Sequence, residues 1–282
     1  MKKVLVTGVN GQLGFDVVKQ LNKKRIEVCG VDIDDFDITN KEQAVTYIGN
    51  FKPDLLIHCA AYTAVDKAED EPEKCSAINI TGTQNIAVAC KQIGVEMIYV
   101  STDYVYGGEN NEPYAETDKL NPLSVYGQTK LEGERIVAQT LDKHYIVRTS
   151  WVFGVNGNNF VKTMLRLGRE KPQLKVVADQ IGSPTYTVDL AAAIIRLTDT
   201  GRYGVYNISN EGFCSWYEFA CQIFAEAGIK TPVNPIKTAE FPTKAVRPLN
   251  SRMSKEKLYS VGVSKMPHWK DAVKRYLEEL QL

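Results

Sequence analysis

The sequence contains six cysteines but no Cys-x-x-Cys pair. Zinc clusters are usually built on such pairs, so we expect free thiols and no cluster of that kind. Acidic and basic residues are equally frequent, at 34 each, and this balance gives no electrostatic reason to bind nucleic acid. No apolar run is as long as a membrane span, and the run after the first two lysines is too short for a signal peptide core. These absences indicate a cytoplasmic protein with neither nucleic acid nor a membrane as its partner.

Short apolar runs alternate with longer amphipathic stretches over the first half of the chain. This alternation predicts βαβ units and a parallel sheet, and nearly continuous apolar strands are typical of a sheet covered on both faces. The expected strands lie at residues 3–7, 28–31, 55–59, 97–101 and 145–148, and the expected helices at 12–23, 41–49, 73–93 and 125–141. Joined by right-handed crossovers, they would form an α/β, doubly wound parallel sheet of the Rossmann type.

The regular alternation weakens after about residue 150. Residues 231–254 carry four of the eleven prolines and show little periodicity. We expect helices at 159–169, 187–197, 215–227 and 269–280, and a strand at 205–208. The sequence therefore predicts a dinucleotide-binding core at 1–150 and a smaller, mainly substrate-binding C-terminal lobe at 151–282, whose segments interleave with the core.

The first predicted strand ends in a turn that carries Gly8, Gly11 and Gly14. Glycines permit a tight turn and a close backbone approach to a pyrophosphate, which the free N–H groups of the next helix can bind. Asp32 follows the second strand, where a carboxylate would bond the adenosine ribose and repel a 2′-phosphate. The pattern predicts a dinucleotide site that favours NADH over NADPH. A generic strand-to-helix turn and a solvated acidic loop are the alternatives.

Tyr126 and Lys130 are four residues apart in a predicted helix and so lie on one helix face. An ammonium group beside a phenol favours the phenolate and lowers the phenol pKa. The pair is therefore a candidate proton-transfer unit, with simple packing beside a solvated charge as the alternative. Small residues at 60–63 and the Ser101-Thr102 pair follow two other strands and could contact a ligand, although helix packing and turn formation explain the same residues.

Together with Asn79, these features resemble the extended short-chain dehydrogenase/reductase superfamily over nearly the whole chain. Finer strings are similar to the dTDP-4-dehydrorhamnose reductase family, and they lie at residues 60–69, 101–106, 122–127, 148–153 and 247–252. The resemblance implies NAD(P)H-dependent reduction of the C4 keto group of dTDP-4-dehydro-β-L-rhamnose, giving dTDP-L-rhamnose for cell-surface polysaccharide synthesis. NADH is the expected cofactor, with NADPH as an alternative, and the nucleotide sugar is the expected small-molecule partner.

The resemblance also implies roles for individual residues. Tyr126 would donate the proton, Lys130 would bond the nicotinamide ribose and lower the tyrosine pKa, and Thr102 would bond the reacting oxygen. The implied cofactor-binding residues are Gly8, Gly11, Gln12, Leu13, Gly14, Asp32, Asp37, Ile38, Ala61, Tyr62, Thr63, Asn79, Tyr126 and Lys130. The implied substrate-binding residues are Thr102, Asp103 and Trp151 at the sugar, and Arg247 and Arg252 at the pyrophosphate.

Two other functions are compatible with the same scaffold. A nucleotide-sugar epimerase or dehydratase would regenerate its cofactor, and a regulatory subunit would bind the cofactor without catalysis. Thr102 is followed by Asp103 and Tyr104 rather than by an Asp-Glu pair, which disfavours a dehydratase. A regulatory subunit is disfavoured because such relatives tend to lose the tyrosine or the lysine of the pair.

Assembly is the last expectation that the resemblance carries. The scaffold often forms homodimers through helix packing, and some family members are metal-linked dimers built on surface glutamates. Asp16 and Val188 occupy two of those positions here, and valine cannot ligate magnesium. We therefore expect no metal site of this kind.

Overall fold

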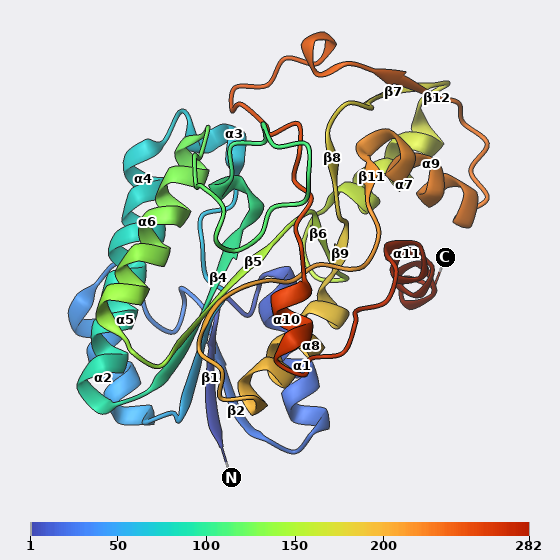
Figure 1. The fold of residues 1–282 in the computed structure, drawn as a ribbon. Helices are drawn as coiled ribbons and strands as arrows, with labels where there is room; N and C mark the ends of the chain where they lie inside the picture. Colours follow the sequence, from blue (N-terminus) through green and yellow to red (C-terminus); the bar gives the residue numbers. More distant parts are fainter. Residues whose placement is uncertain (1, 282) are drawn as a thin grey trace.

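The computed structural model describes residues 2–281 and is built around one six-stranded sheet (Figure 1). All its strands are parallel, and they are ordered β10-β5-β4-β3-β1-β2. They span β1 Lys3–Thr7, β2 Glu27–Val31, β3 Leu55–His58, β4 Glu96–Thr102, β5 His144–Thr149 and β10 Gly204–Asn207. The strand order reverses at β1, so the prediction of an α/β, doubly wound sheet is confirmed.

Helices cover both faces of the sheet because successive side chains of a strand point to opposite sides. Val4 and Val6 of β1 pack with α1 and α8, whereas Leu5 between them packs with α2, α5 and α6. Figure 1 shows the two helical layers on either side of the strands. Their helices are α1 Gln12–Lys23, α2 Lys41–Phe51, α5 Thr83–Ile93, α6 Val125–Thr140, α8 Thr187–Asp199 and α10 Glu256–Ser260.

The last crossover differs from the right-handed ones that the sequence predicts. The connection from β5 to β10 runs along the sheet in the same direction as those from β3 to β4 and from β4 to β5. Its helix α8 packs beside α1, on the opposite face from α5 and α6, so its hand is opposite to theirs. The handedness rule describes direct strand–helix–strand connections. Here residues 150–186 first leave the sheet and fold elsewhere, which removes that constraint.

The helix predicted at residues 73–93 consists of three consecutive pieces. They are α4 Pro72–Ser76, the π-helical turn η1 Ala77–Gly82, and α5. A further short helix, α3 Val65–Ala68, precedes them. π-helical turns are rare and often occur at functional sites, and Asn79 lies in this one.

A second hydrophobic core, rich in aromatic side chains, lies beside the sheet. It includes Phe153, Phe219 and Tyr276 and joins α7 Phe160–Glu170, α9 Trp216–Glu226 and α11 Trp269–Glu279. Three short strand pairs complete this lobe: β6 Val152–Phe153 with β9 Thr185–Tyr186, β7 Leu174–Val177 with β12 Val233–Ile236, and β8 Ile181–Gly182 with β11 Cys214–Ser215. Strand β12 and the 3-10 turn η3 Thr238–Glu240 lie in the segment where the sequence shows little periodicity.

No helix within residues 2–281 is both long enough and apolar enough to cross a membrane.

Candidate active site

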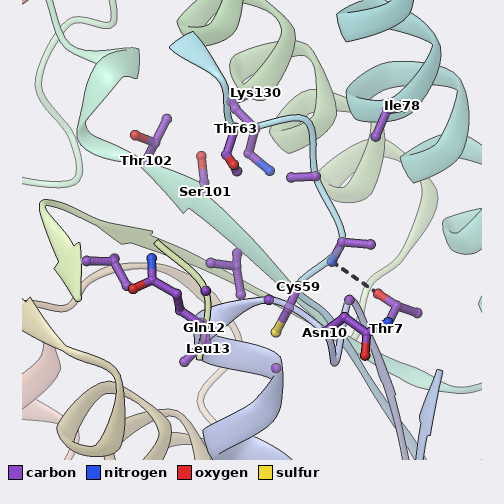
Figure 2. Close-up of a pocket in the computed structure, with 18 of the residues that line it drawn as sticks. Thr7, Asn10, Gln12, Leu13, Cys59, Thr63, Ile78, Ser101, Thr102 and Lys130 are labelled. Atoms are coloured by element: carbon purple, nitrogen blue, oxygen red, sulfur yellow. Dashed lines mark hydrogen bonds between the residues drawn. The ribbon is translucent and has the colours of Figure 1, made fainter. Parts of the chain in front are cut away.

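A cavity of about 830 Å³ opens at the carboxyl ends of β1 to β5. Ligands bind at this edge of open α/β sheets, near the point where the strand order reverses. Figure 2 shows part of the lining, with Asn10 on the turn after β1, Gln12 and Leu13 at the start of α1, and Ser101 and Thr102 at the end of β4. The lining includes most of the predicted site residues, namely Gly8, Gly11, Gln12, Leu13, Gly14, Asp32, Asp37, Ile38, Ala61, Thr63, Thr102, Asp103, Tyr126, Lys130 and Trp151.

The turn between β1 and α1 has room only for glycine at two positions. Gly8 has φ +74°, and a Cβ there would lie 2.6 Å from the Ala60 nitrogen. A Cβ at Gly14 would overlap the Gly8 carbonyl oxygen. Within the described residues no side chain caps α1, so the first N–H groups of this helix, which begins at the cavity, have no side-chain acceptor. This arrangement suits an anion such as a dinucleotide pyrophosphate.

Asp32 is held at the end of β2 by two backbone donors. The Asn10 N–H donates to Asp32 Oδ2 and the Ile33 N–H donates to Asp32 Oδ1, each at 2.9 Å. The carboxylate is therefore fixed at the cavity edge beside the glycine turn. Lys130 is the one cationic side chain among the described lining residues.

Tyr126 and Lys130 both lie on α6, whose start is capped twice. Ser124 Oγ accepts from the Gly127 N–H at 3.1 Å, and Glu69 Oε1 accepts from the Val125 N–H at 2.8 Å. These caps fix the first turn of α6 and with it the position of the Tyr126 phenol. The predicted pair is thus placed in the cavity wall by local helix geometry.

Burial governs the electrostatics of the pair. Burial raises the pKa of Tyr126, and a hydrogen bond with Thr102 opposes this. Lys130 is only 2% exposed, its Nζ lies 4.0 Å from the centre of the Tyr99 ring, and burial lowers its pKa to about 7. Lys130 is not among the groups that shift the Tyr126 pKa here, so the expectation that it lowers this pKa stays a prediction. A phenol with a raised pKa stays protonated at neutral pH, the form that a proton donor requires.

The Thr102 hydroxyl donates a hydrogen bond to a neighbouring carboxylate. Its Oγ1 donates to Asp103 Oδ1 at 3.0 Å and accepts from the Tyr104 N–H at 3.2 Å. A hydroxyl has one proton, so Thr102 must release Asp103 before it can donate to a substrate oxygen. Burial raises the pKa of Asp103 to about 6. Asp103 Oδ2 has no hydrogen-bond partner within residues 2–281, which fits a ligand hydroxyl as its donor.

Asn79 and Tyr62 are not among the residues that line the cavity, although their neighbours Ile78, Ala61 and Thr63 are. Asn79 Oδ1 accepts from the Tyr62 N–H at 2.8 Å, and Asn79 Nδ2 donates to Thr129 Oγ1 at 3.0 Å. The Tyr62 hydroxyl donates to Glu71. The structure thus ties the segment after β3 to α6 through Asn79, and the cofactor contacts expected for these two residues stay predictions.

The two arginines predicted to bind the pyrophosphate also lie outside the lining. Arg247 pairs with Asp66 at 2.7 Å and donates to the Tyr104 hydroxyl at 3.3 Å. Arg252 Nε donates to Asn250 Oδ1 at 2.8 Å. Each guanidinium contacts protein acceptors here but keeps further N–H donors, so the pyrophosphate contact stays a prediction.

Several lining residues escaped the sequence analysis. Their shared signal is position, because most follow a parallel strand at its carboxyl end or lie in the turns beyond it. They are Thr7, Asn10, Val31, Ile33, Phe36, Cys59, Val65, Ile78, Val100, Tyr104, Thr149, Ser150, Val152, Gly157 and Asn158.

His58, at the end of β3, should make folding sensitive to acid. Its Nδ1 pairs with Thr7 Oγ1 at 2.7 Å, and burial lowers its pKa from 6.5 to about 3. Below pH 6.5 the His58 imidazole takes up a proton in the unfolded chain but stays neutral in the folded chain. The contribution of neutral His58 to the free energy of unfolding is therefore fully present above pH 6.5 and is lost as the pH falls toward 3. Lowering the pH from 7.5 to 5.5 should reduce the free energy of unfolding by about 1 kcal/mol through His58, and His58→Gln should abolish this pH dependence. Urea unfolding at both pH values measures it.

The matched control for that measurement is His144→Gln, at a partly buried ring outside the cavity. An unchanged pH slope in His58→Gln would contradict the assignment.

Residues 2–281 contain no group of three or more histidine, cysteine, aspartate or glutamate side chains arranged to hold a metal ion. Asp16 accepts a hydrogen bond from Thr187, and the Val188 carbonyl accepts one from Gln20. The expectation of no metal-linked dimer stays a prediction.

Comparison with known proteins identifies relatives over the whole chain. The family model described as RmlD substrate binding domain matches residues 1–282. A dTDP-4-dehydrorhamnose reductase of Aggregatibacter actinomycetemcomitans is 42% identical over 287 residues, covering 97% of this chain and 98% of the relative. A dTDP-4-dehydrorhamnose reductase crystal structure from Clostridium acetobutylicum has a TM-score of 0.96 at 45% identity, covering 99% of this chain and 100% of that one. The Bacillus anthracis enzyme in complex with NADP also has a TM-score of 0.96, at 44% identity and 99% coverage of both chains. This chain therefore belongs to the RmlD substrate binding domain family.

Proposed function

We propose that this protein reduces the C4 keto group of dTDP-4-dehydro-β-L-rhamnose to give dTDP-L-rhamnose, with a nicotinamide dinucleotide as cofactor. The observation that carries the proposal is one cavity that joins the glycine turn to Thr102, Tyr126 and Lys130. Relatives that cover nearly the whole chain are named dTDP-4-dehydrorhamnose reductases, which supports the substrate.

The cavity residues fit the cofactor. The glycine turn packs tightly against the protein's own backbone at the cavity, and the start of α1 offers N–H groups without a side-chain acceptor. Asp32 lies at the cavity edge, where its carboxylate could accept hydrogen bonds from ribose hydroxyls. When bound, the dinucleotide supplies the hydride.

The protein's own part is to supply a proton and to hold the reacting oxygen. Tyr126 is protonated because burial raises its pKa, and it can give this proton to the oxygen on C4 as negative charge develops there. Thr102, once released from Asp103, can donate to the same oxygen. Lys130 is buried and lines the same cavity as Tyr126. When protonated, its ammonium group would stabilise the tyrosinate that remains after proton transfer.

Cofactor preference provides a direct test of Asp32. The carboxylate would bond the unphosphorylated ribose and repel a 2′-phosphate, so we expect the wild-type protein to favour NADH. Asp32→Ala should lower kcat/KM for NADH about tenfold and leave that for NADPH unchanged or higher. Asp34→Ala, at an exposed neighbour outside the lining, is the control. Equal loss with both cofactors would contradict this role.

The reaction itself is tested by following NADH loss with dTDP-4-dehydro-L-rhamnose, repeated with NADPH and with the UDP analogue. A reductase oxidises one NADH for each substrate consumed, whereas an epimerase consumes none. Turnover of the sugar without net NADH oxidation would favour the epimerase alternative, and cofactor binding without turnover would favour a regulatory subunit.

We further propose that residues 151–282 mainly form the substrate-binding lobe, that the protein works in the cytoplasm, and that it forms a homodimer through helix packing. Support for the lobe comes from its separate aromatic core and from Trp151, which lines the cavity.

A further inference from the structure

Trp151 lies in the cavity wall with an unusual backbone conformation. Its φ is +47°, in the left-handed region that bulky side chains rarely adopt. Such a conformation persists only where the surroundings impose it, and it is often found at ligand sites. The residue follows β5 and precedes β6, so it stands where the chain leaves the main sheet for the lobe.

Contacts on two sides impose this conformation. The Trp151 ring stacks on the Trp216 ring, with centroids 3.5 Å apart and planes at 10°. Gly182 approaches the same indole so closely that a Cβ there would lie 2.6 Å from Trp151 Cε2. The Trp151 carbonyl also accepts from the Thr185 N–H at 3.1 Å. The indole is therefore held between a second aromatic ring and a position that admits only glycine.

Both holding residues come from one strand pair of the lobe. Gly182 ends β8, which pairs with β11, and Trp216 follows β11 as the first residue of α9. Ile181, next to Gly182, accepts from the Ser251 N–H at 2.7 Å and donates to the Leu249 carbonyl at 2.8 Å. Trp216 and Gly182 are thus fixed to a shared backbone framework rather than to flexible loop tips.

We propose that Trp216 and Gly182 are positioning residues that hold the Trp151 indole as a rigid wall for the sugar ring of the substrate. The inference rests on the proposed function for the identity of the sugar. The part of the indole that lines the cavity can contact a pyranose ring and its methyl group, whereas the nucleotide and the cofactor have other binding groups. Losing either positioning residue should therefore weaken recognition of the sugar selectively.

The test compares binding of dTDP-L-rhamnose with binding of dTDP, because the difference between them isolates the sugar. The chain has three tryptophans, so a Trp269→Phe background leaves only the stacked pair as a fluorescence and circular-dichroism signal. Trp269 packs against Phe219, and its replacement alone serves as the matched control. We expect Trp216→Ala and Gly182→Ala to weaken dTDP-L-rhamnose binding about tenfold, and dTDP and NADH binding less than about twofold. Trp216→Phe, which keeps a stacked ring, should restore most of the loss.

Equal weakening of dTDP and dTDP-L-rhamnose, or no change in either, would overturn the proposal. If Trp216→Ala does not fold, Gly182→Ala decides, since it perturbs the same indole from a second contact. The outcome is separable from the proposed function, because binding of the two nucleotides is measured without turnover. A chain that shows the sugar-selective loss but does not oxidise NADH would refute the reductase assignment and leave the role of Trp216 standing.

Discussion

Tyr126→Phe is expected to lower kcat about 10²- to 10⁴-fold while NADH binding stays within about twofold of wild type. The phenol lies in the cavity wall near Thr102, and burial raises its pKa, so at neutral pH it carries the proton that the reaction needs. Phenylalanine keeps the ring, and with it the edge contact to Tyr104 at 5.6 Å between centroids, but removes the proton. Stopped-flow measurement of NADH oxidation and titration of NADH fluorescence give the two quantities.

The control for this substitution is Tyr62→Phe. Tyr62 is a phenol of the same kind, but it is not among the lining residues and its hydroxyl donates to Glu71. Its loss should leave kcat within about twofold, since no reacting group contacts its hydroxyl. Wild-type turnover in Tyr126→Phe would show that another group supplies the proton, and Asp103 would then be the first candidate.

The sequence predicts well the site residues that local geometry places. Gly8, Gly14 and Asp32 follow strands whose ends meet at one sheet edge, and Tyr126 and Lys130 share a helix face, so spacing alone brings them together. The lowered pKa of Lys130 was not predictable from the sequence, because it depends on how deeply the lysine is buried where α6 packs against β4. The four-residue spacing of Tyr126 and Lys130 carries no information about that burial.

Contacts between segments that are far apart in the sequence escaped prediction for a different reason. Arg247 is oriented by Asp66, 181 residues earlier in the chain, and no local pattern reveals that pairing. The opposite hand of the β5 to β10 connection likewise depends on the lobe folded between these strands. Gly182 shows the same limit, since its need for glycine comes from an indole that a different strand presents.

Glu134→Gln is expected to lower the free energy of unfolding by about 3–5 kcal/mol. Glu134 and Arg148 are 4% and 2% exposed, and the guanidinium donates to both carboxylate oxygens, at 2.9 and 2.7 Å. Glutamine leaves the arginine charge buried without its counter-charge, and the loss of a counter-charge costs far more than the intact pair contributes. Glu134 also accepts from Ser101 Oγ at 2.5 Å, so the strand end that lines the cavity loses an anchor as well.

A matched pair on the same helix separates this effect from ordinary helix electrostatics. Glu132 and Arg135 are paired at 3.1 Å but exposed, so Glu132→Gln should cost less than about 1 kcal/mol. Glu134 also raises the pKa of Lys130 against the larger effect of burial, so its removal should lower that pKa further and shift the pH profile of kcat to lower pH. Urea unfolding and pH–rate profiles of both variants measure the two effects. Equal stability losses in the two variants would mean that burial of the Glu134–Arg148 pair does not govern its energetics.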